Sequence, residues 1–263
     1  MLPIILAAFG TTTNAMKTYT FMDTIFRKRF SNHPIYWSFS SRVVRERMKK
    51  DHQFNMKQPQ DVLTDVFQKG HTWAVVQSLH LTPGYEFDGL IENTIHHDMR
   101  VSIGLPLLYT PEDYYAVIQA LAAVYDIETH FPDTSLAQII IGHGTTHPIW
   151  TSCIALNSMI QQKWPHKGVY VSTIEYPLID RKKLIQTIRT AGYTRVRLIP
   201  LLLVTGNHFL KDLSAPENSW TSDCESAGLT VTLEPNGLGY QPAVVDLFCE
   251  HIESAIDVIP GQS

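Results

Sequence analysis

The sequence has few of the features that mark exported or disulfide-stabilised proteins. Its 263 residues include only three cysteines, Cys153, Cys224 and Cys249, and no CxxC pair. An odd number of widely spaced thiols argues against a disulfide framework and a cysteine zinc site, and predicts small core residues in a reducing cytoplasm. The apolar start MLPIILAAFG has no basic segment before it. This start therefore predicts a first buried strand and not a signal peptide.

Long hydrophobic runs and an excess of positive charge are also missing. No run of 18 apolar residues occurs, so the sequence predicts no membrane span. Lysine and arginine number 21 against 25 acidic residues, and the formal net charge of -4 argues against a nucleic-acid partner. The 44% hydrophobic content is enough for one large or two small domains. The charge mix does not indicate how many chains associate, and a homo-oligomer stays open.

Buried strands alternate with amphipathic helical segments along the whole chain, which is typical of an α/β protein with parallel sheets. The last predicted element is a helix over Pro242–Val258. The predicted strands are Leu2–Ala8, Ile35–Phe39, Trp73–Leu79, Met99–Ile103, Leu136–Ile141, Gly168–Ile174, Arg195–Val204 and Leu229–Leu233.

The two halves of the sequence resemble one another. Ile4–Thr12 aligns with Gln138–Thr146 without a gap, and Thr82–Phe87 aligns with Thr205–Phe209 after one gap. Such a repeat indicates internal duplication of a four-stranded α/β unit. We therefore predict two similar lobes, each a four-stranded parallel sheet flanked by helices, with a cleft between them.

A polar stretch over Glu128–Ser135, which contains a proline, separates the halves. It predicts an N-terminal lobe over 1–128 and a C-terminal lobe over 129–263. Only the second half has a histidine in both aligned segments. The first lobe is therefore expected to form a cleft wall and the second to carry the metal site.

Three predicted strands of the second half end at residues that can bind a metal: His143, Glu175 and His208. Strands joined by helical crossovers run parallel, so their carboxyl ends share one edge, where α/β sheets bind ligands. Two imidazoles and one carboxylate with open coordination positions suit a divalent first-row metal. For each histidine taken alone, a structural role in the core is the alternative.

Eight motifs in a fixed order cover nearly the whole chain: AAFGTTT, AVVQSLHLTPGYE, IGLPLL, IIIGHGTTH, STIEYP, LIPLLLVTGNHFLKD, ENSW and NGLG. In this order they resemble the class II chelatases of tetrapyrrole biosynthesis, most closely the anaerobic cobalt chelatases. The resemblance implies a chelatase-like fold and insertion of Co²⁺ into sirohydrochlorin with release of two protons. It also implies that His143, Glu175 and His208 bind the metal, that His143 accepts protons and that Glu175 assists.

The resemblance further implies donors for the eight carboxylates of sirohydrochlorin. Backbone N–H groups and hydroxyls at helix starts favour anions, although plain helix capping is the alternative. Three aromatic residues, Tyr109, Trp150 and Trp220, are candidates either for stacking on the macrocycle or for the core. The candidate substrate-binding residues are Gly10, Thr11, Thr12, His80, Glu86, Gly144 and Thr145.

Several alternatives stay open from the sequence. The divalent metal is expected as substrate, with cobalt first and iron or nickel as alternatives, because a site of this composition follows the general affinity order. No organic cofactor is expected. A tetrapyrrole or metal carrier without turnover, and a solute receptor of periplasmic-binding type, are the rival functions.

Overall fold

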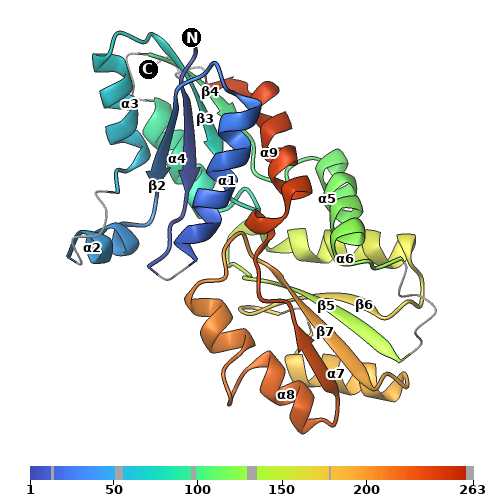
Figure 1. The fold of residues 1–263 in the computed structure, drawn as a ribbon. Helices are drawn as coiled ribbons and strands as arrows, with labels where there is room; N and C mark the ends of the chain where they lie inside the picture. The colour runs from blue at the N-terminus through green and yellow to red at the C-terminus, as the bar shows by residue number, and fades with distance from the viewer. Residues whose placement is uncertain (13–14, 51–55, 96–98, 129–134, 178, 259–263) are drawn as a thin grey trace. The chain divides into compact units, whose positions relative to one another are not determined.

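In a computed structural model, the chain divides into two compact units, each built around one β-sheet. The structure describes residues 1–12, 15–50, 56–95, 99–128, 135–177 and 179–258. Unit 1 comprises Met1–Thr110 and Pro242–Ser263, and unit 2 comprises Pro111–Gln241. Figure 1 shows the ribbon of both units. Among the described residues, no helix combines the length and apolar character needed to cross a membrane.

Unit 1 has a five-stranded sheet in the order β2-β1-β3-β4-β9, in which the first four strands are parallel and β9 is antiparallel to β4. The strands are β1 (Ile4–Ala8), β2 (Ile35–Phe39), β3 (Trp73–Ser78), β4 (Arg100–Gly104) and β9 (Ile256–Val258). The helices are α1 (Met16–Arg29), α2 (Arg42–Lys50), α3 (Pro59–Gln68), α4 (Tyr85–Ile95) and α9 (Pro242–Glu253).

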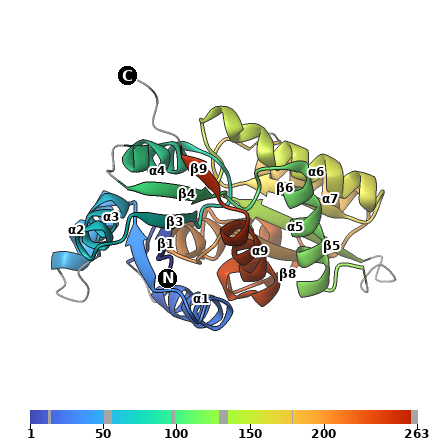
Figure 2. The same ribbon diagram turned by 90° about the horizontal axis from the view of Figure 1, so that it is seen from above.

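Helices cover both faces of this sheet, so its inner strand β1 is buried along its whole length. Ile5 and Ala7 pack with Val62 of α3 and Phe87 of α4 on one face. Helices α1 and α9 pack against each other, and Figure 2 shows α1 and α4 on opposite sides of the sheet. Burial on both faces explains why these strands are continuous apolar runs in the sequence.

Unit 2 has a four-stranded, fully parallel sheet in the order β6-β5-β7-β8. Its strands are β5 (Leu136–Gly142), β6 (Val169–Thr173), β7 (Arg195–Leu201) and β8 (Thr230–Leu233). Its α-helices are α5 (Pro111–Val124), α6 (Ser152–Lys163), α7 (Arg181–Thr190) and α8 (Trp220–Ser226), and its short helices are η1 (Pro148–Thr151), η2 (Phe209–Leu213) and η3 (Leu238–Tyr240).

The same strand order in both units confirms the two repeated four-stranded parallel sheets. The first strand of each half, β1 or β5, pairs with the second and third strands of that half. The turn after this strand also repeats, because Gly10 and Gly144 have φ angles of 97° and 88°. Only glycine adopts this left-handed conformation at little cost. The sequence alignment of Ile4–Thr12 with Gln138–Thr146 therefore corresponds to a repeated backbone shape.

The division into units differs from the predicted boundary at residues 128 and 129. Helix α5 follows β4 but packs on α6 of unit 2, and helix α9 follows β8 but packs on α1 and the sheet of unit 1. Each half of the sequence thus donates its last helix to the unit formed by the other half. An amphipathic pattern shows that a helix has a buried face, but not which sheet covers it. Residues 129–134 of the predicted linker lie outside the described residues.

Two predicted elements end differently in the structure. The closing helix stops at Glu253, and Ile256–Val258 forms β9, which gives the edge of β4 a hydrogen-bonding partner. The predicted strand Arg195–Val204 ends at Leu201, and the π-helix η2 follows after a short turn. Strand and helix periods are hard to separate in short apolar runs, which explains both errors.

The cysteines are free thiols, as expected. Cys224 and Cys249 are buried, and burial raises the pKa of each to about 12. Cys153 is partly buried, and its pKa is raised to about 11 for the same reason. Thiols with such high pKa values are poor nucleophiles and poor metal ligands at neutral pH.

Candidate metal centre

The carboxyl ends of β5, β6 and β7 meet at one edge of the unit 2 sheet, and the backbone ties two of them together. The N–H of Ile174 donates to the carbonyl of Gly142 at 2.9 Å, and the N–H of Glu175 donates to the carbonyl of His143 at 2.8 Å. The parallel ladder thus continues one step past the strands. It fixes the backbone of His143 against the backbone of Glu175.

Position 144 must be glycine, because this edge leaves no room for a side chain there. Its φ is 88°, and a Cβ added there would lie 1.9 Å from the carbonyl oxygen of Glu175. Any other residue would push the two strand ends apart. Gly144 therefore permits the close approach that positions His143.

The structure brings His143 and His208 into direct contact, as the predicted shared edge requires. Their Nε2 atoms are 3.1 Å apart. The ring centroids are 4.4 Å apart and the ring planes are nearly perpendicular, at 83°. Both residues are exposed, so a solute can reach the pair.

Hydrogen bonds on the far side of each ring determine where its proton lies. His143 Nδ1 is 2.8 Å from the carbonyl oxygen of Gly144, and His208 Nδ1 is 3.0 Å from Oδ2 of Asp212. A carbonyl and a carboxylate accept hydrogen bonds, so each neutral ring must carry its proton on Nδ1. Both Nε2 atoms then present lone pairs to each other. Such an arrangement is relieved by a positive charge between the nitrogens, either a proton shared by the two rings or a metal cation bound to both.

The separation of the two nitrogens suits one metal ion. Imidazole nitrogens lie about 2.0–2.1 Å from a bound first-row metal such as zinc, so two ligands at 90–109° are roughly 2.8–3.4 Å apart. The observed 3.1 Å falls within this interval. Oriented imidazoles with Nδ1–H bonded to an oxygen are the usual arrangement of metal-binding histidines. The spacing of the pair therefore suits two nitrogen ligands of one divalent cation, and metal binding by the pair stays a prediction.

The predicted third ligand, Glu175, does not join this pair. Among the described residues, no group of three or more His, Cys, Asp or Glu side chains is arranged to hold a metal. Glu175 is exposed and contributes its main chain, through the hydrogen bond to His143 and the contact with Gly144. Sequence spacing correctly placed its backbone at the edge, but side-chain direction after a strand depends on the turn that follows.

Asp212 is a site residue that the sequence analysis missed. It lies four residues after His208, at the spacing that brings side chains together on a helix. The sequence predicts only a strand over Arg195–Val204 that ends near His208, with no helix directly after it, so the HxxxD spacing does not stand out as a helical pair. The π-helix η2 is a type of helix often found at functional sites.

In unit 1, Gly10 and Thr11 are engaged in the fold. The N–H of Gly10 donates to the hydroxyl of Tyr19 at 3.2 Å, and Thr11 is buried. Thr12 is half-buried. The N–H of Gly10 is therefore already used, and a substrate role for these three residues stays a prediction.

His80 follows β3 at the same edge of the unit 1 sheet. Its Nδ1 is 2.8 Å from the hydroxyl oxygen of Ser78. Its Nε2 is buried and has no hydrogen-bond partner, and burial lowers the pKa of His80 to about 4. Glu86, in the first turn of α4, is exposed. His80 is thus a neutral buried ring at neutral pH, whereas Glu86 is open to a ligand.

The remaining predicted residues divide between structural and open positions. The hydroxyl of Thr145 accepts from the N–H of His147 at 3.1 Å, which stabilises the turn after His143. Trp220 is 1% exposed and belongs to the core, whereas Tyr109 and Trp150 are exposed by 47% and 51%. Of the three aromatic candidates, only Tyr109 and Trp150 can therefore stack on a ligand.

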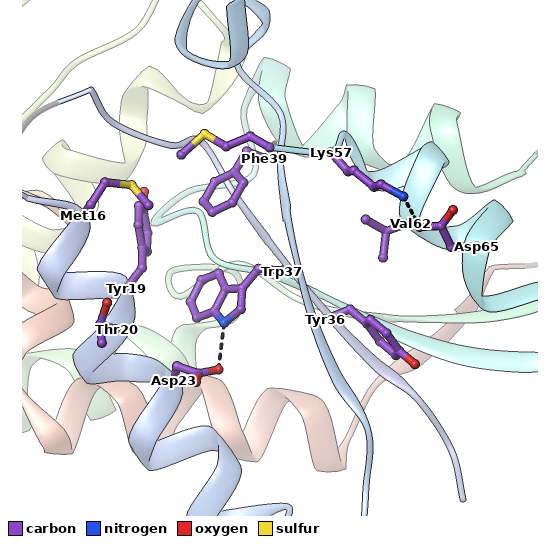
Figure 3. Close-up of a pocket in the computed structure, with 11 residues that line it drawn as sticks. Met16, Tyr19, Thr20, Asp23, Tyr36, Trp37, Phe39, Lys57, Val62 and Asp65 are labelled. Atoms are coloured by element: carbon purple, nitrogen blue, oxygen red, sulfur yellow. Dashed lines mark hydrogen bonds and ion pairs between the residues drawn. The ribbon is translucent and has the colours of Figure 1, made fainter. Parts of the chain in front are cut away.

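Unit 1 also has a hollow between α1, β2 and α3, shown in Figure 3. Tyr19, Trp37 and Phe39 line it, and the indole N–H of Trp37 donates to Asp23 at 2.8 Å. Lys57 and Asp65 form an ion pair there. These polar groups satisfy one another, so the hollow offers no group prepared for chemistry.

The repeated parallel sheets and the converging imidazoles define a two-unit α/β protein with two histidines paired at the edge of one sheet. The family model for cobalt chelatase (CbiK) matches residues 3–257. The chain therefore belongs to the cobalt chelatase family CbiK, which confirms the resemblance carried by the sequence motifs.

Two curated relatives are similar over most of their length. The chain is 29% identical to the sirohydrochlorin cobaltochelatase CbiKC of Nitratidesulfovibrio vulgaris, covering 97% of this chain and 91% of the relative. It is 27% identical to the sirohydrochlorin cobaltochelatase of Salmonella typhimurium, covering 85% of this chain and 84% of the relative.

Solved structures support the fold. SirB from Bacillus subtilis with Fe³⁺ gives a TM-score of 0.66 at 16% identity, covering 97% of this chain and 95% of that chain. The sirohydrochlorin chelatase SirB from Bacillus subtilis subspecies spizizenii, in complex with cobalt, gives 0.62 at 15% identity with the same coverage. The chelatase-like α/β fold predicted from the sequence is thereby confirmed.

Replacing Gly144 with alanine is expected to disturb the metal site as well as the fold. Gly192 provides the control, since its φ is 92° but nothing lies within 4 Å of an added Cβ. Gly192→Ala should lower the stability only by the cost of placing alanine in the left-handed conformation, about 1–2 kcal/mol. Gly144→Ala should lower the melting temperature further and weaken Co²⁺ binding, measured by calorimetry. Equal effects of the two substitutions would contradict the proposed close packing.

His80 is expected to make stability depend on pH. Its pKa is about 4 in the folded chain and about 6.5 in an unfolded one, so protonation favours unfolding. The free energy of unfolding should therefore fall as pH drops from about 6.5 to 4, by at most about 1.4 kcal/mol per pH unit. Denaturant titrations of the parent and His80→Gln should show a shallower pH dependence in the variant. The same slope in both would show that His80 titrates normally.

Asp212 is expected to increase the affinity of His208 for metal. Asp212→Ala removes the acceptor of the Nδ1 proton, so the ring can turn or change tautomer, and Co²⁺ binding should weaken about 10- to 100-fold. Asp212→Asn keeps an oxygen acceptor and should lose less of the Co²⁺ affinity. Glu225→Gln, at an exposed carboxylate of α8, is the control and should not change the affinity. If Asp212→Ala binds Co²⁺ as the parent does, the orienting role is wrong.

Proposed function

We propose that the chain is a sirohydrochlorin cobaltochelatase, which inserts Co²⁺ into sirohydrochlorin and releases two protons. The observation that carries the proposal is the pair of Nε2 lone pairs of His143 and His208, held 3.1 Å apart by hydrogen bonds on the opposite sides of the rings. Membership of the cobalt chelatase family and the names of the two curated relatives support the metal and the macrocycle.

The reaction balances on these two rings. The incoming ion is a substrate that His143 and His208 bind in their neutral forms. As the ion passes to the four nitrogens of the macrocycle, both Nε2 lone pairs are released. Two pyrrole N–H protons must leave the macrocycle in the same step, and a neutral imidazole can accept a proton at physiological pH. Each released ring can therefore take one proton and later pass it to water.

The two rings are not equivalent in this scheme. The carboxylate of Asp212 lies against Nδ1 of His208, whereas Nδ1 of His143 has only the carbonyl of Gly144. Asp212 thus orients His208 toward the metal. His143 remains the residue proposed to accept the pyrrole protons.

Other residues are proposed to contribute less to the reaction than His143 and His208. The Glu175 carboxylate is expected to offset positive charge during transfer, without being a ligand in the described arrangement. Binding of the substrate stays a prediction. The residues proposed for it remain Gly10, Thr11, Thr12, His80, Glu86, Gly144 and Thr145, of which Glu86 carries the same charge as the substrate carboxylates and is proposed to contact another part of the macrocycle.

Cobalt is the proposed metal, since the family and both curated relatives are named for it. Two imidazoles do not by themselves select cobalt over iron or nickel, because affinity follows the general divalent order. No redox step occurs in the insertion, so the proposal requires no organic cofactor. We place the enzyme in the cytoplasm, where its three free thiols stay reduced.

Removing either imidazole should abolish most of the activity. An anaerobic absorbance time course with sirohydrochlorin and Co²⁺ should show many turnovers by the parent, and about 100-fold slower insertion by His143→Ala and His208→Ala. Glu175→Gln is the comparison and should retain Co²⁺ affinity within a few-fold. Parallel runs with Fe²⁺ and Ni²⁺ test the metal. Insertion limited to one equivalent would instead identify a carrier.

A further inference from the structure

Tyr176 has a backbone conformation that its residue type rarely adopts. Its φ is 49°, and it immediately precedes Pro177, a position that favours extended backbone. Three other non-glycine residues in the described chain have positive φ: Asp126, His166 and Asn218. Aspartate, histidine and asparagine tolerate this region, whereas a bulky residue there is an outlier. The conformation of Tyr176 therefore costs stability.

The strained backbone of Tyr176 continues directly from the metal centre. Glu175, its neighbour, donates its N–H to the carbonyl of His143 at 2.8 Å, and its carbonyl oxygen lies where a Cβ of Gly144 would be. The turn after His143 and the turn that carries Tyr176 are thus packed against each other. The position of the tyrosine is coupled to that of the metal-binding imidazole.

The side chain gains nothing in the described structure that would offset this cost. Tyr176 is 65% exposed, the most exposed aromatic side chain of the described residues, and no hydrogen bond of its hydroxyl occurs among them. Other large apolar side chains follow the strand ends at the same edge, including Trp150 at 51% and Leu210 at 55% exposure. Strained, exposed residues of this kind gather where a ligand supplies the missing contacts.

We propose that Tyr176 is a substrate-contact residue whose ring packs against the face or rim of the tetrapyrrole, placing the macrocycle over His143 and His208. This inference rests on the proposed function for the identity of the macrocycle. A large planar conjugated ligand suits an aromatic side chain, because stacking needs ring surface and no matched hydrogen bond. The tyrosine determines where the macrocycle lies, and the histidines act on the metal and protons.

Binding of metal-free sirohydrochlorin tests the proposal without requiring insertion. Titration followed by absorbance should show about 10-fold weaker binding by Tyr176→Ala and near-parental binding by Tyr176→Phe, which keeps the ring. Tyr115→Ala is the matched control, since Tyr115 is 60% exposed on α5 of the same unit and should have no effect. Calorimetry should show parental Co²⁺ affinity in all three variants.

Tyr176→Gly separates a contact role from a structural one. Glycine accepts the positive φ, so this variant should melt at or above the parental temperature while binding sirohydrochlorin as weakly as Tyr176→Ala. Equal sirohydrochlorin binding by the parent, Tyr176→Ala and Tyr176→Gly would overturn the inference. A lower melting temperature of Tyr176→Gly would do so too, since it would assign the ring a stabilising role.

The proposed chelatase function and the proposed contact of Tyr176 can fail independently of each other. A parent protein that binds sirohydrochlorin but inserts no metal would refute the chelatase proposal, while weak binding by Tyr176→Ala would still support the contact. A parent that inserts Co²⁺ and a Tyr176→Ala variant with parental KM would refute the contact alone. With the contact in place, Tyr176→Ala should raise KM for sirohydrochlorin about 10-fold and change kcat little.

Discussion

Two imidazole nitrogens that face each other across 3.1 Å are the constraint around which the candidate metal centre is built. In water two neutral imidazoles would turn so that an N–H met a nitrogen. Here the carbonyl of Gly144 and the carboxylate of Asp212 retain the Nδ1 protons of the neutral rings, so the two Nε2 atoms meet as acceptors. The fold supplies this arrangement in advance, and a cation relieves it. Exposure of both rings suits a site that must release its ion as readily as it takes it.

Close backbone packing maintains this arrangement. The parallel ladder between β5 and β6 extends past the strands through the N–H of Glu175, and Gly144 lets the two chains touch. His208 immediately precedes a different kind of element, the π-helix η2, in which Asp212 lies 3.0 Å from its Nδ1. A rigid sheet edge on one side and a short irregular helix on the other thus share the metal site.

Much of this was predictable because parallel strands must end together. The sequence correctly predicted the repeated sheets, the edge, and the meeting of His143 with His208. It could not show that Glu175 contributes its main chain and stays out of the histidine pair, since the alternation of a strand does not continue into the turn that follows it. Asp212 was missed because a helix start after an apolar strand has no separate hydrophobic period. The domain boundary was wrong because helices α5 and α9 carry an apolar face that either sheet could cover.

The exchange of α5 and α9 has a consequence for how such a protein can arise. A half-length chain with this order of elements would lack, on one face of its sheet, the helix that the other half supplies. Two identical copies could supply that helix to each other by trading their last helices, as in a domain-swapped dimer. Joining the copies end to end converts that mutual dependence into a single chain. One copy is then free to specialise its strand ends for metal while the other changes independently.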